Sequence, residues 1–244
     1  MPVSGGWHVV QGDRPRRTLS TAAMIGPYFV VRLDPASPGM SADEFLHRPQ
    51  LHALVDDVAR RLGTTELRVA LSSLQYELAE RLWSVVLGSW ATAGLIPELD
   101  PLRYGRSPSG RIRLHLLSPT AREQPDVTPT DAAGVIAEIV VGRLASLHLA
   151  LHSVTRIADG LLWGNAAAAL VLVTRTLENR GGNQHDVLAV SRALLAEKPL
   201  TDRVDGDVAA RIVRRTCCLY YRTAAQRACG DCPLTDAAVV RGRT

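Results

Sequence analysis

Hydrophobic and polar positions alternate with a helical period over most of this chain. Apolar residues recur at every third or fourth position in five stretches separated by glycine, proline or polar residues. The second stretch contains Gly88, where it could divide into two helices. The fourth is apolar on most sides, which favours a central place in the fold. We therefore expect helices near residues 42–62, 67–96, 132–152, 159–177 and 187–197.

Two segments follow a different pattern. Residues 28–33 are rich in β-formers and predict a strand, and residues 101–117 predict a hairpin whose turn lies at Ser107–Gly110. The second arm of that hairpin alternates basic and apolar residues, so its basic side chains should share one face. The pattern predicts a helix-dominated α+β fold in a single domain with a few antiparallel strands. We expect a helical body over residues 1–206, followed by a C-terminal segment over 207–244.

Composition narrows the class of protein. The chain has 244 residues, 46% of them hydrophobic and 21% charged, which is enough to form a globular domain with a substantial core. The net charge of +4 is compatible with an anionic small molecule or partner and does not indicate nucleic acid. No secretory signal is visible, and the most apolar window, 160–173, is interrupted by Asn165. It is shorter than the ~20 residues of a spanning helix. We expect a cytoplasmic protein without a transmembrane segment.

All four cysteines lie close together near the C-terminus. They form a Cys217-Cys218 pair, followed after ten residues by Cys229-Gly-Asp-Cys232. In a reducing compartment disulfides are disfavoured, so metal ligation is the better interpretation. Four thiolates can close a tetrahedral sulfur site for zinc or for iron–sulfur chemistry.

The vicinal pair bears on which metal is held. Neighbouring side chains in an extended segment point to opposite sides, so Cys217 and Cys218 need a local turn or must bind different metal ions. This suits a two-iron cluster better than a single zinc, although four-cysteine ligation serves both and spacing alone leaves both open. Gly230 and Asp231 favour a tight turn whose free N–H groups could bond to sulfur. Pro233 should stiffen the exit.

The cysteine pattern resembles the C-terminal ligand pattern of the FhuF-type ferric-siderophore reductases. The segment Leu161-Leu162-Trp163-Gly164-Asn165-Ala166 is also similar to a recurrent family segment, so the resemblance covers about residues 130–235. It implies a 2Fe–2S cluster as cofactor. The ligands would be Cys217, Cys218, Cys229 and Cys232.

The resemblance further implies an iron–sulfur oxidoreductase that reduces chelated Fe(III) and releases Fe(II), which oxygen donors bind more weakly. The chain shows no Gly-rich phosphate loop or dinucleotide fingerprint, so electrons should arrive from a separate donor protein or reductant. The alternative is a non-enzymatic iron–sulfur or zinc module that senses redox state or binds a partner.

Other residues are weaker candidates. Arginines near the cysteines could attract an anionic ferric siderophore or an acidic donor, or could simply be a solvated face. The substrate candidates among them are Arg214, Arg215, Arg222 and Arg227. His148 and His152 stand at a metal-binding spacing, but no supporting carboxylate accompanies them and packing is the better account. Asn165, in an apolar helix, needs a hydrogen-bond partner, which favours a structural tie.

Overall fold

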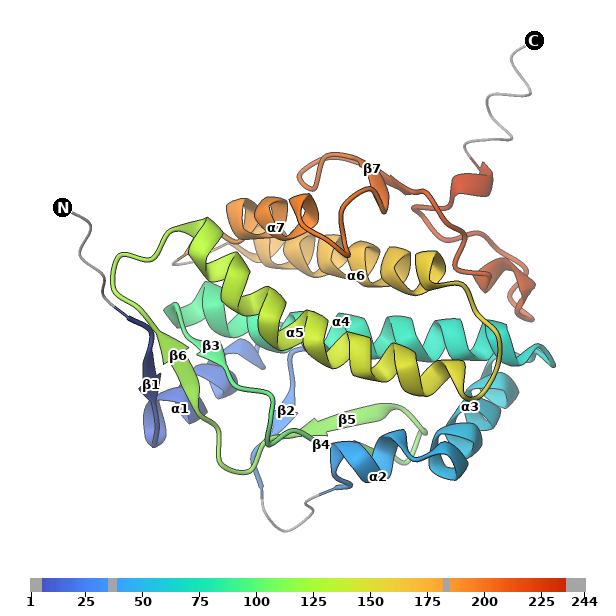
Figure 1. Cartoon of the computed structure of the whole chain (residues 1–244), viewed down its shortest axis with the longest axis horizontal. Helices are drawn as coiled ribbons and strands as arrows, with labels where there is room; N and C mark the ends of the chain where they lie inside the picture. The colour runs from blue at the N-terminus through green and yellow to red at the C-terminus, as the bar shows by residue number, and fades with distance from the viewer. Residues whose placement is uncertain (1–5, 35–38, 182–184, 236–244) are drawn as a thin grey trace.

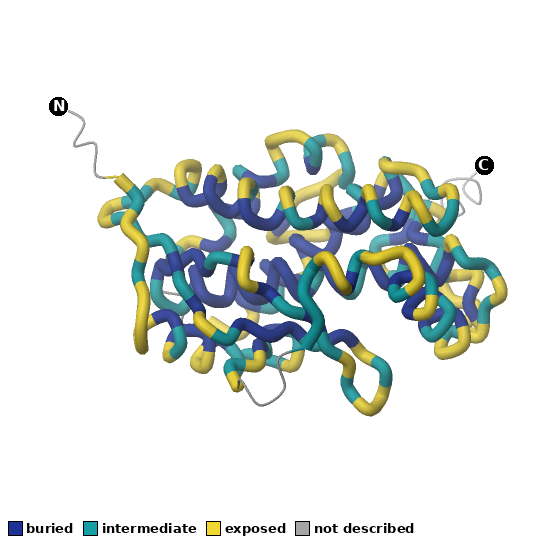
Figure 2. The backbone as a smooth tube through the Cα atoms, turned by 60° about the horizontal axis from the view of Figure 1, so that its bottom comes forward, coloured by how far each residue is buried: buried dark blue, intermediate teal, exposed yellow. Residues whose placement is uncertain are grey.

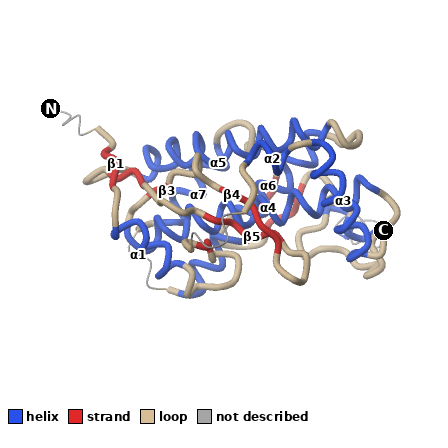
Figure 3. Tube along the Cα trace, turned by 90° about the horizontal axis from the view of Figure 1, so that it is seen from below, coloured by secondary structure: helices blue, strands red, loops and turns tan. Residues whose placement is uncertain are grey.

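Helices make up most of the protein, and the strands are short (Figures 1 and 3). The computed structural model describes residues 6–34, 39–181 and 185–235. Its helices are α1 (Asp13–Ala22), α2 (Ala42–Leu46), α3 (Arg48–Leu62), α4 (Leu67–Ala93), α5 (Pro129–His152), α6 (Asp159–Arg180), α7 (Val187–Ala196) and the 3-10 helix η1 (Tyr220–Arg222). Its strands are β1 (His8–Val10), β2 (Val31–Arg32), β3 (Ile96–Pro97), β4 (Arg103–Arg106), β5 (Ile112–His115), β6 (Ala121–Glu123), β7 (Val204–Gly206) and β8 (Ile212–Arg214).

Helix α4 is the centre of the structure. It runs through the middle of the molecule, packs most extensively on α6 and also contacts α1, α3, α5 and α7 (Figure 1). Most of its side chains are buried, because it has neighbours on every side (Figure 2). The indole of Trp83 is fully buried and donates a hydrogen bond to the Ala166 carbonyl at 3.0 Å, which ties α4 to α6.

Gly88 does not divide the second helix. The α4 helix continues through it to Ala93, and the missing side chain makes room for an aromatic ring. A Cβ at this position would lie 2.6 Å from Cδ1 of Phe29. Gly88 therefore allows α4 to pack closely against the segment before β2 and does not break the helix.

The strands form three small sheets. β1, β6 and β3 form one antiparallel sheet, and β7 pairs with β8 in a hairpin. In the third sheet, β4 and β5 form the expected antiparallel hairpin, while β2 joins β5 in parallel. The helix-dominated α+β class is confirmed, with this one parallel pairing added to the antiparallel ones.

Several helix ends differ from the expected ones. The first predicted helix is split at His47 into α2 and α3, and Ser41 forms an N-terminal capping box with Glu44. Helix α5 begins earlier than expected because Thr128, not Asp131, is its N-cap. The strand near 28–33 is reduced to β2. The strands β1, β3, β6, β7 and β8 are too short to give a clear alternation in sequence.

The predicted division of the chain stays a prediction. The β7–β8 hairpin crosses the expected boundary after residue 206, so the C-terminal segment is joined to the body by backbone pairing. Residues 236–244 of that segment lie outside the described residues.

Two helices, α5 and α6, are long and apolar enough to cross a membrane by length and composition alone. In α6, 72% of the most apolar window is buried inside the protein, as expected for a core helix. In α5, 39% of the corresponding window is buried. The expected absence of a transmembrane segment stays a prediction.

Candidate metal centre

The cysteine-bearing segment lies against α4 and α6 (Figure 1). Ser72 of α4 donates a hydrogen bond from its hydroxyl to the Cys218 carbonyl at 2.8 Å, and Thr216 donates to the Gly160 carbonyl of α6 at 3.0 Å. The first two cysteines are therefore held on both sides by helices of the core.

Gly164 allows the segment to come close to α6. A Cβ on Gly164 would collide with Oγ1 of Thr216, the residue directly before Cys217. Glycine in a helix interior costs about 1 kcal/mol relative to alanine, so a packing reason is expected for it. Here the reason is the close passage of the cysteine segment.

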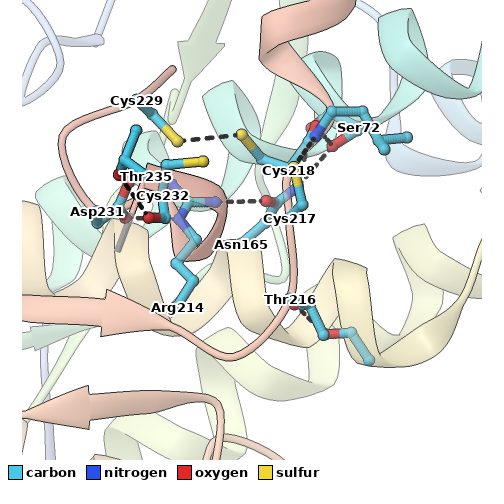
Figure 4. A network of polar contacts seen from close by, with 12 residues as sticks. Ser72, Asn165, Arg214, Thr216, Cys217, Cys218, Cys229, Asp231, Cys232 and Thr235 are labelled. Atoms are coloured by element: carbon cyan, nitrogen blue, oxygen red, sulfur yellow. Dashed lines mark hydrogen bonds and ion pairs between the residues drawn. The ribbon is translucent and has the colours of Figure 1, made fainter. Parts of the chain in front are cut away.

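A buried polar network joins the segment to the body (Figure 4). Asn165 donates to Oγ and to the backbone carbonyl of Ser72, at 3.0 and 3.1 Å, and its Oδ1 accepts from Arg214 at 2.6 Å. Arg214 is only 3% exposed and also donates to Asp231 at 2.5 Å, while its guanidinium lies over the ring of Tyr76. Asn165 is thus the expected structural tie, and it also reaches the cysteine segment through Arg214.

The backbone turns sharply after the vicinal pair. Leu219 has a φ of 66°, in the left-handed region that non-glycine residues rarely adopt. This turn directs the Leu219 N–H to the sulfur of Cys217 at 3.3 Å, and the Tyr220 N–H bonds to Cys218. A local turn, one of the two alternatives that the sequence left open for the vicinal pair, follows Cys218 and supplies N–H donors to sulfur.

The Cys229–Cys232 hook is also a tight turn. The Cys232 N–H donates to the Cys229 carbonyl at 3.2 Å. Within the described residues, the N–H donors to sulfur come from Leu219 and Tyr220 rather than from Gly230 and Asp231. Asp231 instead pairs with Arg214 through its side chain and accepts the Arg214 N–H through its carbonyl at 2.9 Å.

The four cysteines form one connected group. The sulfurs of Cys218 and Cys229 lie 3.4 Å apart, and the Cys217 thiol interacts with both Cys218 and Cys232. Two sulfurs on one tetrahedral ion, each about 2.3 Å from it, would lie roughly 3.7 Å apart. Cys218 and Cys229 are thus already spaced like two ligands of one metal ion.

This donor set fits a two-iron cluster. In the described part of the chain, no three metal-binding side chains surround a single ion position. Cys218 and Cys229 would hold one iron, and Cys217 and Cys232 would hold the other, which places the two neighbouring cysteines on different irons. The bound cluster would supply one-electron redox chemistry.

The surroundings favour a thiolate at Cys218. The Cys229 thiol donates to its sulfur, and the Arg214 guanidinium and the Tyr220 N–H act in the same direction against the effect of burial. Together they lower the pKa of Cys218 to about 6. The pKa of Cys229 is raised because its proton is held in that hydrogen bond and because it is partly buried. Burial also raises the pKa of Cys217. A site with one ready thiolate and an adjacent arginine is suited to begin metal ligation.

A cavity of about 780 Å³ opens beside this group. Its wall includes Cys218 and Cys229, and the other walls come from α3, α4, α6 and β8. This volume is typical of small-molecule sites. The cavity therefore meets the metal centre at the Cys218–Cys229 pair.

The candidate arginines are spread over different environments. Arg214 is buried in the network, Arg215 is exposed and pairs with Asp202 and Asp205, and Arg222 pairs with Glu66 at 3.1 Å. Arg227 is exposed. Of these four, Arg214 lines the cavity. Their role toward a substrate stays a prediction.

The two histidines of α5 point to different partners. His148 is buried, accepts a hydrogen bond from Gln75 at 2.9 Å and packs edge-on against Trp163. His152 pairs with Asp159 at 2.8 Å. Packing, an account preferred from sequence, is what the structure shows for His148, whereas His152 is exposed and pairs with Asp159.

Sequence reasoning missed Ser72 and Tyr76 of α4. A signal was present, because α4 carries polar residues at positions that an apolar core helix normally fills with aliphatic side chains. Each buried polar group needs a partner, and the Cys218 peptide and the Arg214 network are the partners here.

The fold and the site define an iron–sulfur protein whose cluster-binding segment is docked on a helical body. Residues 214–234 match the family model described as the FhuF 2Fe-2S C-terminal domain, so the chain carries the cluster segment of the FhuF-type family. The matched range contains the four cysteines together with Arg214 and Asp231. A search of curated proteins finds no match to the chain.

Proposed function

We propose that the protein is a ferric-siderophore reductase of the cytoplasm, which transfers one electron to chelated Fe(III) and releases Fe(II). The observation that carries the proposal is the FhuF 2Fe-2S match on a connected group of four cysteines that borders a cavity of about 780 Å³. A redox centre beside a small-molecule cavity is what reduction of a bound chelate requires.

The residues of the chain have simple roles in this reaction. Arg214, Asn165 and Ser72 fix the cysteine segment on the core, so that the redox centre is held rigidly at the wall of the cavity. Electron transfer between the cluster and a chelate needs no general acid, base or nucleophile. Ferrous iron binds siderophore oxygens much more weakly than ferric iron, so reduction releases the metal without breaking the chelator. A separate protein or reductant would restore the electron.

Metal analysis and a single-turnover reaction test the proposal. The protein, purified without oxygen, should contain about two irons and two sulfides per chain and give the EPR signal of a reduced two-iron cluster. Mixing it with a ferric siderophore and a ferrous-iron trap should reoxidise the cluster and release one ferrous ion per cluster.

Cys232→Ser tests whether the reaction depends on the cluster, because it removes one buried cysteine that does not line the cavity. It should lose the cluster and the reaction together. A colourless protein with a single zinc, or a reduced cluster that ferric siderophores leave unchanged, would rule the proposal out.

A further inference from the structure

Three carboxyl groups line the cavity, and two of them are paired with arginines. Asp231 pairs with Arg214 at 2.5 Å, and Glu77 lies between two guanidinium groups, at 3.8 and 3.7 Å. Among the described residues, no hydrogen bond or ion pair involves the carboxyl group of Glu80, the third of the set. Its oxygens are not sealed in the core, so they are accessible from the cavity.

The surroundings of Glu80 favour its protonated form. Burial, followed by the neighbouring charge of Glu77, raises the pKa of Glu80 to about 7 against the opposing effects of Arg81 and Arg111. The other titratable or charged groups near it are Tyr28, Arg61 and Tyr76. A two-iron cluster held by four thiolates is negative overall, and a negative charge at the same cavity raises the pKa of a carboxyl group further. Glu80 therefore carries a proton in much of its population at neutral pH.

Glu80 and the cysteines lie at two ends of one wall of the cavity. Ser72, which donates to the Cys218 carbonyl, and Glu80 both line the cavity and are eight residues apart on α4. At a rise of 1.5 Å per residue, they are about 12 Å apart along the helix. Tyr76 lies midway between them and lines the cavity too. A chelate that fills this length contacts the Cys218–Cys229 edge and Glu80 at the same time.

Release of iron leaves a chelator with strongly basic oxygens. Hydroxamate and catecholate oxygens are stronger bases than a carboxylate, so they bind protons at neutral pH once the iron has left. Electron transfer itself needs no acid, but an oxygen that separates from Fe(II) can bind the metal again until a proton occupies it. The best donor is a group whose pKa lies near the working pH and which reaches the oxygen directly.

From this placement we infer that Glu80 is the proton donor of the reaction, acting on a chelator oxygen after the iron has been reduced. The inference rests on the proposed function and adds a catalytic residue to it. One electron from the metal centre converts Fe(III) to Fe(II). The weakened iron–oxygen bond breaks with its electron pair left on oxygen, and this pair takes the proton of Glu80 to form an O–H bond. Glu80 then regains a proton from the solvent, which also protonates the remaining oxygens of the chelator.

A single-turnover reaction with two signals separates reduction from release. The reduced protein is mixed with a ferric trihydroxamate and a ferrous-iron trap, so that visible absorption follows cluster reoxidation and the trap follows Fe(II). Release should slow by at least about tenfold between pH 6 and pH 9, as Glu80 loses its proton. Glu80→Gln should slow release at pH 6 by about tenfold, remove its pH dependence and leave reoxidation within about twofold. Glu138→Gln, on α5 and away from this cavity, is the matched control.

Infrared spectroscopy of the oxidised protein tests the proton on Glu80 without any turnover. The carbonyl stretch of a protonated carboxyl group should be present at pH 6 and should disappear at higher pH, with a midpoint at or above about 7. This band should be missing in Glu80→Gln and retained in Glu138→Gln. A wild-type spectrum without the band at pH 6 would overturn the inference.

The kinetic outcomes separate the inference from the proposed function. If ferric chelate reoxidises the cluster in both proteins and Glu80→Gln releases Fe(II) as fast as the wild type, the inference falls and the proposed function stands. Equal slowing of reoxidation and release in Glu80→Gln would also overturn the inference, because a proton donor that acts after reduction affects release alone. A reduced cluster that ferric chelates leave unchanged would overturn both.

Discussion

Arg214 and Asp231 form a buried ion pair, Nε to Oδ2 2.5 Å, between the residues that precede the vicinal cysteines and the hook that carries the other two. Burial disfavours the charge of Arg214, but the Asp231 carboxylate and the Cys218 sulfur outweigh it, and the pKa of Arg214 is raised. The pair therefore holds the two halves of the ligand set together and keeps a positive charge beside the metal centre.

Removing this guanidinium should be strongly destabilising. In Arg214→Met, Asp231 and Asn165 lose their shared partner, and we expect the free energy of unfolding to fall by about 3–5 kcal/mol, with loss of the cluster. The neighbouring Arg215→Met removes an exposed arginine and should cost no more than about 1 kcal/mol. Chemical unfolding and visible absorption of both variants would check this. Equal effects of the two substitutions would contradict the role given to Arg214.

Gly164→Ala should damage the metal centre while its neighbour tolerates the same change. The added methyl group would displace Thr216, so we expect a cost of about 1–3 kcal/mol and reduced cluster content. In Gly160→Ala the new Cβ would meet its nearest neighbours at 3.7 Å, an ordinary contact, and cluster content should stay normal. Iron per chain in the two variants is the measurement. Full iron content in Gly164→Ala would show that the close passage is not needed.

Binding of an anionic chelate in the cavity should weaken as the pH rises through 7. Glu80, whose pKa is about 7, becomes negative in this range and repels an anionic ligand, with Glu77, Arg81 and Arg111 as its charged neighbours. We expect a roughly three- to tenfold loss of affinity between pH 6 and pH 8. Glu80→Gln should flatten this profile, and binding of a neutral chelate should stay constant in both proteins. Calorimetry of gallium chelates measures it. A profile in Glu80→Gln as steep as in the wild type would assign the titration to another group.

His148 should make the fold sensitive to acid. Burial lowers its pKa to about 4 and outweighs the opposing charge of Asp159, and His152 adds a smaller effect in the same direction as burial. The unfolded chain takes up this proton below about pH 6.5 and the folded protein only near pH 4, so stability is full above 6.5 and falls toward 4. Between pH 7 and pH 5 this amounts to about 2 kcal/mol.

Urea unfolding at the two pH values measures that effect. His148→Gln should remove most of the difference, whereas His52→Gln, at a half-exposed position of α3, should leave it in place. An unchanged difference in His148→Gln would exclude His148 as its source.

Sequence patterns predicted the parts of the fold that depend on local periodicity. The long helices and the 103–115 hairpin follow from the spacing of apolar residues, and the grouping of the cysteines follows from their own spacing. Gly88 misled the prediction, because a glycine that breaks a helix and one that admits Phe29 look the same in sequence.

Features that depend on tertiary contacts could not be predicted from the sequence pattern. Arg214 belongs to a run of arginines, and nothing in that run marks it as buried while Arg215 is exposed. The cavity is assembled from α3, α4, α6 and β8, which lie far apart in the chain, so its charge could only be counted after folding.

The left-handed turn at Leu219 has a consequence for how the metal centre is assembled. A leucine in this conformation costs about 1–2 kcal/mol, and its neighbours hold it there through the Cys218 carbonyl and the Ser72 hydroxyl. The helical body therefore holds the vicinal cysteines directly, whereas the hook is joined to them through the Asp231–Arg214 pair. We expect the Cys229–Cys232 hook to move when iron and sulfide bind, while the Cys217–Cys218 pair stays in place.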